Sequence, residues 1–322
     1  MRPFLHPLPF LSRTLIMLTL VAFSSGCPAT EEPAVVLATS SADADVPAST
    51  DHGICLALGG GGANGLAHIA ILAAFEELDL RPAHMAGTSI GAVIGALFAA
   101  GISTDEIRTL VQGIVAEEIN VKELLRNGQG MRWVKFLEPD LDPGGLLESD
   151  AFIDLLRETI QGKTFDELSV PLQVVAADQW TREEVILGKG DVAGAVQASM
   201  AVPGLFKPVS MDGRFLVDGG LVNPVPYDIL FNQCEHVVAV NVTGKNGEPT
   251  DISSLDSMFM AFQTMQESIV REKLRRRMPD IYIETDIVGV RMMQFHKLSA
   301  VEEQAGVAKK DLKAQLQSLV SE

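Results

Sequence analysis

The sequence has little positive charge: 25 lysines and arginines stand against 42 aspartates and glutamates, which gives a formal net charge of −17. A nucleic-acid-binding protein needs a basic stripe for the phosphates, so no nucleic acid is expected as a partner. The same balance excludes broad electrostatic adhesion to anionic lipid. Because 47% of the 322 residues are hydrophobic, the chain can still bury a full core, and its length allows one large domain or two small ones.

Cysteine is also scarce. The three cysteines are Cys27, Cys55 and Cys234, and no C-x-x-C spacing or pairing with histidine indicates a metal site, so neither a metal nor a cofactor is expected. Cys55 and Cys234 lie in or beside apolar runs of strand length. Because nothing here has the pattern of a disulfide framework, two buried free thiols are favoured over a disulfide.

The N-terminal region has no hydrophobic run long enough to cross a bilayer. Leu15–Phe23 is nine residues long, whereas a spanning helix needs about 20. A basic start, this short apolar core and small residues after it are typical of an export signal over residues 1–26. Gly26-Cys27 resembles the lipobox of bacterial lipoproteins, which implies cleavage before Cys27 and its lipidation. The alternative is an ordinary secretory signal, since Ser24 stands where the lipobox usually has leucine.

Large apolar residues are nearly absent between the signal and the rest of the chain. Residues 27–51 are rich in Ala, Ser, Thr, Pro and Asp, so we expect a flexible tether there. Residues 52–322 show no composition break and no repeat, and are expected to form one domain. The protein is therefore predicted to be exported to the bacterial cell envelope. There it is either anchored to the membrane through Cys27 or periplasmic or secreted.

Two glycine-framed turns lie near the start of this domain. Gly59–Gly65 reads GGGGANG after the apolar run Ile54–Leu58, and Gly87–Gly91 reads GTSIG after Ala83–Ala86. The second has the G-x-S-x-G form of a nucleophile elbow, in which a tight strand-to-helix turn exposes the serine hydroxyl. The first offers consecutive backbone N–H groups at a helix start, which suits negative charge. Together they indicate a nucleophile and a site for the oxyanion it creates.

Strand-length apolar runs alternate with helical patterns over the whole domain. Further strands are predicted at Leu172–Ala177, Arg214–Val217 and His236–Val242. This alternation predicts an α/β domain with a mostly parallel sheet, in which ligands bind beyond the carboxyl ends of the strands. Local patterns also predict a capping box at Ser103–Glu106, a helix cap at Asp191 and a hairpin turn at Asp212-Gly213.

A carboxylate follows one of these strands: Asp218 comes after Phe215–Val217 and before Gly219-Gly220. Alone, it reads as a helix cap or turn former. With the two glycine turns and Ala198–Phe206 (ASMAVPGLF) in this order, it resembles the patatin-like phospholipase family over roughly residues 53–310. The resemblance implies a three-layer α/β/α fold around a mostly parallel central sheet.

The resemblance also implies a lipid acyl hydrolase of the phospholipase A type with a Ser–Asp dyad and no catalytic histidine. Ser89 is then the nucleophile that forms an acyl-enzyme, and Asp218 is the general base. The N–H groups of Gly60, Gly61 and Gly62 form the oxyanion hole. The residues that frame these groups are Asn64, Gly65, Gly87, Gly91, Gly219 and Gly220. The implied partners are a lipid or phospholipid ester and a membrane surface, and no protein partner is indicated.

One residue departs from the family pattern. The family usually has arginine or lysine at the position of Asn64, whose neutral amide can cap the following helix and tolerates positive φ. This departure supports an alternative function. In that alternative, the chain is a catalytically weak or inactive envelope lipoprotein that uses the fold as a lipid-binding or interaction module.

Two other readings of the motifs are excluded by what is missing. Gly60-x-Gly62-x-x-Gly65 fits the dinucleotide fingerprint, but the acid that this site needs about 20 residues later is absent from His84–Thr88. A conventional triad needs a histidine after the acid. Only His236 and His296 follow Asp218, and they are interpreted as structural and surface residues. His68, on an apolar helix, is expected to be satisfied by the core.

Four segments are candidates for lipid contact, each with a simpler interpretation. Met131–Leu137 is either an interfacial anchor or a cap over the site, and Trp180 is expected at a hairpin tip. The basic cluster Arg271–Arg277 is expected to be the solvated end of a helix over about 252–277. Met258, Met260 and Met265 are expected to fill the core or line an acyl pocket.

Overall fold

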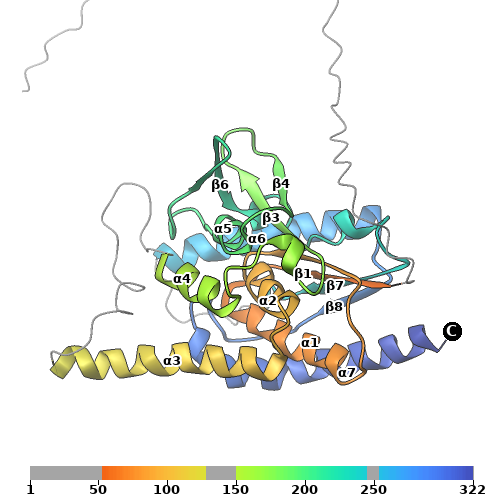
Figure 1. Cartoon of the computed structure of the whole chain (residues 1–322), viewed down its shortest axis with the longest axis horizontal. Helices are drawn as coiled ribbons and strands as arrows, with labels where there is room; N and C mark the ends of the chain where they lie inside the picture. The colour runs from red at the N-terminus through yellow and green to blue at the C-terminus, as the bar shows by residue number, and fades with distance from the viewer. Residues whose placement is uncertain (1–52, 128–149, 245–253, 322) are drawn as a thin grey trace, which may run out of the picture. The chain divides into compact units, whose positions relative to one another are not determined.

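The computed structural model describes residues 53–127, 150–244 and 254–321 (Figure 1). The strands are β1 (Ile54–Leu58), β2 (His84–Thr88), β3 (Leu172–Asp178), β4 (Glu184–Leu187), β5 (Val209–Met211), β6 (Arg214–Asp218), β7 (His236–Asn241) and β8 (Ile281–Glu284). The α-helices are α1 (Ala67–Glu76), α2 (Ile90–Ala99), α3 (Thr104–Asn127), α4 (Asp150–Thr159), α5 (Val192–Ser199), α6 (Ser254–Arg276) and α7 (Leu298–Val320). Short 3₁₀ helices include η1 (Gly62–Leu66), η4 (Gly219–Leu221), η5 (Asp228–Leu230) and η6 (Phe295–Lys297).

These strands form one mixed sheet. Its order is β5-β6-β3-β2-β1-β7-β8, and β4 also pairs with β3. The pairs from β3 through β2, β1 and β7 to β8 are parallel, whereas β4, β6 and β5 are joined by antiparallel pairs. Parallel pairing puts the carboxyl ends of β1 and β2 at one edge of the sheet, where both glycine turns begin.

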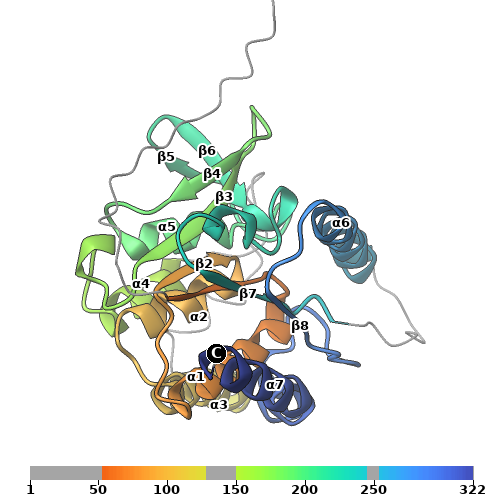
Figure 2. The same ribbon diagram turned by 90° about the vertical axis from the view of Figure 1, so that its right-hand side faces the viewer.

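Helices cover both faces of the sheet, which confirms the predicted three-layer α/β/α fold (Figure 2). Alternate residues of a strand face opposite sides. In β1, Leu56 and Leu58 belong to the large core that α1, α2, α5 and α7 complete. Cys55 and Ala57 belong to a second core, which includes Tyr227 and residues of α6. The helix α6 therefore packs on the face opposite to α1 and α7.

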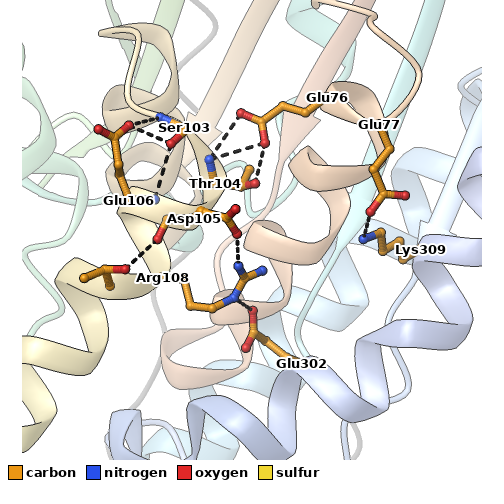
Figure 3. Close-up of polar contacts among 10 residues, drawn as sticks. Glu76, Glu77, Ser103, Thr104, Asp105, Glu106, Arg108, Glu302 and Lys309 are labelled. Atoms are coloured by element: carbon orange, nitrogen blue, oxygen red, sulfur yellow. Dashed lines mark hydrogen bonds and ion pairs between the residues drawn. The ribbon is translucent and has the colours of Figure 1, made fainter.

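Polar contacts join the helices of the larger layer to one another (Figure 3). Arg108 of α3 donates from Nε to Glu302 of α7 at 2.6 Å, and Lys309 of α7 pairs with Glu77 at the end of α1. The predicted capping box is present: the Ser103 N–H donates to Glu106 Oε2 at 2.9 Å, and the Glu106 N–H donates to Ser103 Oγ at 3.3 Å. These contacts fix where α3 begins relative to its neighbours.

Most of the other local predictions are confirmed. The three predicted strands are β3, β6 and β7, and Asp191 accepts hydrogen bonds from the first turn of α5. Asp212 and Gly213 turn the hairpin between β5 and β6, both with positive φ. Trp180 is 74% exposed and lies in the loop that joins the antiparallel strands β3 and β4, at the predicted hairpin tip.

The expectation of two free thiols is wrong, because Cys55 and Cys234 form a disulfide. Cys55 lies in β1 and Cys234 lies just before β7, the strand that pairs with β1 in parallel. This pairing brings together two cysteines that are 179 residues apart, with their Cα atoms at 5.7 Å. The contact depends on the order of the strands in the sheet, which cysteine count and spacing do not encode.

One residue at the end of α6 and two of its three predicted methionines differ from expectation, while the third, Met260, is half-buried. The basic end of the helix is solvated as predicted at Arg271, Arg275 and Arg276, which are 66%, 77% and 77% exposed. Lys273 is the exception, because its side chain is 15% exposed and its Nζ pairs with Asp228 at 2.5 Å. Met258 and Met265 are 38% and 53% exposed, so they neither fill the core nor line an internal pocket.

Several predictions fall on residues outside those that the structure describes. They are the signal over residues 1–26, the lipidated Cys27 with the tether over 27–51, and the Met131–Leu137 segment. Within the described ranges, no helix combines the length and the apolar character needed to cross a membrane.

The disulfide should contribute to stability, because a cross-link between residues so far apart restricts the unfolded chain. We expect a reductant to lower the free energy of unfolding by about 2–4 kcal/mol. Urea unfolding with and without reductant measures this. The matched control is Cys234→Ser, whose stability should not respond to reductant. An equal response of both proteins, or no response of the wild type, would contradict the disulfide.

Candidate active site

The G-x-S-x-G turn folds as a nucleophile elbow. Ser89 follows β2 directly and precedes α2, with φ 54° and ψ −124°, a conformation that non-glycine residues rarely adopt. A Cβ on Gly87 would lie 2.7 Å from the Cα atom of Ala92, and a Cβ on Gly91 would overlap the carbonyl group of Leu58. Only glycine allows this close approach at either position. The side chain of Ser89 is held at the edge of the sheet.

The strained elbow is held by a serine from another element. The Ser89 N–H donates to Oγ of Ser199 at 2.8 Å, and this hydroxyl donates to the carbonyl oxygen of Val175 in β3 at 2.6 Å. Ser199 is the last residue of α5 and is fully buried. Ser199 belongs to the ASMAVPGLF segment, one of the motifs that resemble the family. The sequence did not indicate that its hydroxyl bridges the elbow and β3.

Asp218 lies beside the elbow, at the end of β6. Its Oδ1 accepts the N–H of Gly220 at 2.7 Å, whereas its Oδ2 has no hydrogen bond within 3.5 Å among the residues described. Burial raises the pKa of Asp218 to about 6, although the facing Ser89 hydroxyl and the Gly220 N–H both act to lower it. The carboxyl group is therefore a stronger base than an exposed aspartate.

The first glycine turn lies against the elbow and has two free donors. A Cβ on Gly60 would be 3.3 Å from Cβ of Ser89. The N–H of Gly60 donates to the carbonyl of Pro224 at 2.9 Å, and the N–H of Ala63 donates to the carbonyl of Met292 at 2.8 Å. In the part of the chain that the structure describes, the N–H groups of Gly61 and Gly62 have no such acceptor. Of the three predicted oxyanion donors, Gly60 is therefore already bonded within the chain, and the N–H groups of Gly61 and Gly62 remain as candidates.

The side chain of Asn64 does not have the predicted capping role. Its Nδ2 donates to the carbonyl oxygen of Thr243 at 3.1 Å, and Gly61, the residue before η1, has no side-chain cap. The positive φ in this turn belongs to Gly62, not to Asn64. Asn64 is buried and links the glycine turn to the segment after β7, a contact with a residue 179 positions away.

His68, His236 and His296 lie where the sequence predicted, in the core, at the start of a strand and at the surface. His68 in α1 is fully buried, and burial lowers its pKa to about 4, so the ring is neutral at neutral pH. Its Nε2 lies 2.8 Å from the carbonyl oxygen of Gly59, to which the protonated nitrogen donates. His236 begins β7, and His296 is exposed in η6. Among the described residues, no cluster of three or more His, Cys, Asp or Glu side chains could hold a metal.

An apolar pocket opens beside Ser89. Its walls come from α2, α3 and α4, from the segment after α5 and from the segment before η6. The lining includes Leu97, Leu110, Phe152, Phe206, Met292 and Met293. The methionines of this pocket are thus not the three that the sequence indicated. The apolar lining of this pocket suits a hydrocarbon chain.

Ser199 provides a test of the elbow. Ser199→Ala leaves the Ser89 N–H and the Val175 carbonyl without this buried partner, so the free energy of unfolding should fall by about 1–3 kcal/mol. Urea unfolding measures the loss. Ser210→Ala, at an exposed serine of β5, is the control and should change little. An equal effect of both substitutions would contradict the bridging role.

Comparison with known proteins identifies relatives of this chain. A sequence model of the patatin-like phospholipase family matches residues 56–231. An uncharacterised NTE family protein of Mycobacterium tuberculosis is 30% identical over 205 residues, which cover 63% of this chain and 53% of that protein. Human patatin-like phospholipase domain-containing protein 6 is 31% identical over 216 residues, covering 64% of this chain and 14% of that protein. The chain thus spans about half the length of the mycobacterial relative.

Solved structures give a weaker likeness. VipD from Legionella pneumophila has a TM-score of 0.43 at 16% identity, over 82% of this chain and 66% of that one. The type III effector ExoU has a TM-score of 0.41 at 16% identity, over 82% and 53%. The family match covers more than half of the sequence and includes both Ser89 and Asp218, and the chain therefore belongs to the patatin-like phospholipase family.

Proposed function

We propose that this protein is a serine acyl hydrolase that cleaves the carboxylic ester bonds of lipids, including phospholipids, through a Ser89–Asp218 dyad. The main observation behind the proposal is that three features of a serine hydrolase lie close together. A strained serine, a buried carboxylate with one free oxygen and an apolar pocket lie together at one edge of the sheet.

The reaction follows from these groups. Asp218 removes the proton from the Ser89 hydroxyl as the serine oxygen attacks the ester carbonyl carbon, while the acyl chain lies in the pocket. The N–H groups of Gly61 and Gly62 stabilise the oxyanion of the tetrahedral intermediate, and each such donor is typically worth about 3–4 kcal/mol. The proton returns to the departing alcohol. Water activated by Asp218 then hydrolyses the acyl-enzyme.

The proposal extends to the location of the enzyme. The export signal, the cleavage before Cys27 and its lipidation would place the domain on a tether at the cell envelope, near its lipid substrate. The disulfide between Cys55 and Cys234 supports an oxidising compartment, since disulfides are rare in reducing cytosol. Mass measurement of the mature N-terminus in the membrane fraction tests the lipid on Cys27, and an unmodified cysteine there would remove the anchor.

The dyad is tested by fatty acid release from phospholipid vesicles and from soluble short-chain esters. We expect Ser89→Ala and Asp218→Asn each to lower kcat by about 10³-fold or more, since the two groups act as a unit. Ser210→Ala, which removes an exposed serine hydroxyl, should retain full activity. Equal turnover by wild type and Ser89→Ala would favour a non-catalytic lipid-binding module. Activity on soluble esters alone would make the protein an esterase instead of a phospholipase.

The pH dependence should report the buried base. Asp218 accepts a proton only when ionised, and its pKa is raised to about 6. We therefore expect kcat/KM to rise about tenfold per pH unit below pH 6 and to level off above it. A pH–rate profile between pH 4 and 8 on a neutral ester measures this. A plateau that extends down to pH 4.5 would contradict a buried Asp218 as the base.

A further inference from the structure

A buried polar side chain near the dyad has no partner. Gln266 lies in α6 and is 2% exposed, and its amide, whose atoms are not fully enclosed, has no hydrogen-bond partner among the described residues. In folded proteins, the polar groups of a buried residue are nearly always bonded to protein or water. An amide that the fold itself does not use is available to a ligand.

The amide lies between the two glycines that border the dyad. A Cβ on Gly60 would be 3.6 Å from Gln266 Nε2 and 3.3 Å from Ser89 Cβ. A Cβ on Gly220 would overlap Nε2 and would also lie 2.9 Å from Oδ1 of Asp218. The absence of side chains at Gly60 and Gly220 therefore makes the room that the amide occupies beside the reacting groups.

Another glutamine of α6, one turn earlier in the helix, has a structural role. Gln263 is also buried, at 8% exposure, and its Nε2 donates to the carbonyl oxygen of Thr243 at 3.3 Å. The same carbonyl accepts from Asn64 in the glycine turn. Gln263 thus attaches α6 to the site, so the position of Gln266 is fixed without the use of its own amide.

Gln266 and the apolar pocket border Ser89 from different sides. The pocket reaches Ser89 beside Gly62 and Ile90, and Gln266 is not part of its lining. Gln266 approaches from Gly60 and Gly220 instead. If the pocket takes the acyl chain, the amide faces the part of the ester that leaves, which is the alcohol.

We propose that Gln266 determines specificity for the alcohol half of the ester: its amide donates a hydrogen bond to a hydroxyl or ester oxygen of a glycerol-type leaving group. This inference rests on the proposed hydrolase function. It assigns the polar recognition of the substrate to α6 and the apolar recognition to α2, α3 and α4.

The test uses two substrates with the same acyl chain, a monoacylglycerol and a p-nitrophenyl ester, and the full chain carrying Gln266→Met. Methionine keeps the size of the side chain but cannot donate. We expect kcat/KM for the monoacylglycerol to fall about tenfold or more, the effect of one lost hydrogen bond, and kcat/KM for the nitrophenyl ester to stay within about twofold. The melting temperature should not fall, because the substitution removes an unpaired buried amide.

Gln263→Met is the matched control, and any loss that it causes should be equal on the two esters. Gln266→Leu repeats the test if the methionine variant fails to fold. An equal loss on both substrates, or no loss on either, with Gln266→Met would overturn the role of Gln266 while leaving the hydrolase intact. Absence of fatty acid release by the wild type from either substrate would overturn the hydrolase itself and the inference with it.

Discussion

Parallel pairing of β1 with β2 is the constraint on which the site depends. It places the ends of both strands at one edge, so that the glycine turn and the elbow lie in contact. That contact leaves no room for a side chain at Gly91, whereas a Cβ on Gly87 would meet Ala92 within the elbow itself. Ser89 has a strained backbone between these two glycines. The strain is maintained from outside the turn, by the hydroxyl of Ser199. The five residues of the elbow thus set its shape, and the sheet and α5 hold it in place.

The electrostatics of the site are set by burial and by neutral groups. Among the residues that the structure describes, no cation contributes to the pKa of Asp218, which burial raises to about 6. A lysine or arginine directed toward the dyad would lower this pKa and would make the carboxylate a weaker base. Asn64 avoids this effect, since it carries no charge and its amide binds the carbonyl of Thr243. The departure from the family pattern is thus compatible with a basic Asp218.

What the sequence predicted well was encoded locally. The elbow, the strand that ends at Asp218 and the caps at Ser103 and Asp191 each depend on a few neighbouring residues, and all are present. The contacts that it could not predict join distant parts of the chain. The disulfide and the Asn64–Thr243 bond each span 179 positions, and no local pattern records such a separation.

Gln263 and Gln266, one helical turn apart, also show that local sequence does not predict which distant groups a side chain contacts. Both are glutamines on the buried side of α6, and in sequence they are equivalent polar residues. Within the described residues, Gln263 donates to the carbonyl group of Thr243, whereas no hydrogen bond of Gln266 is found. Gln266 meets two glycines instead. The amide of Gln266 therefore stays open to a group that enters the site beside Ser89, which is the role that we propose for it.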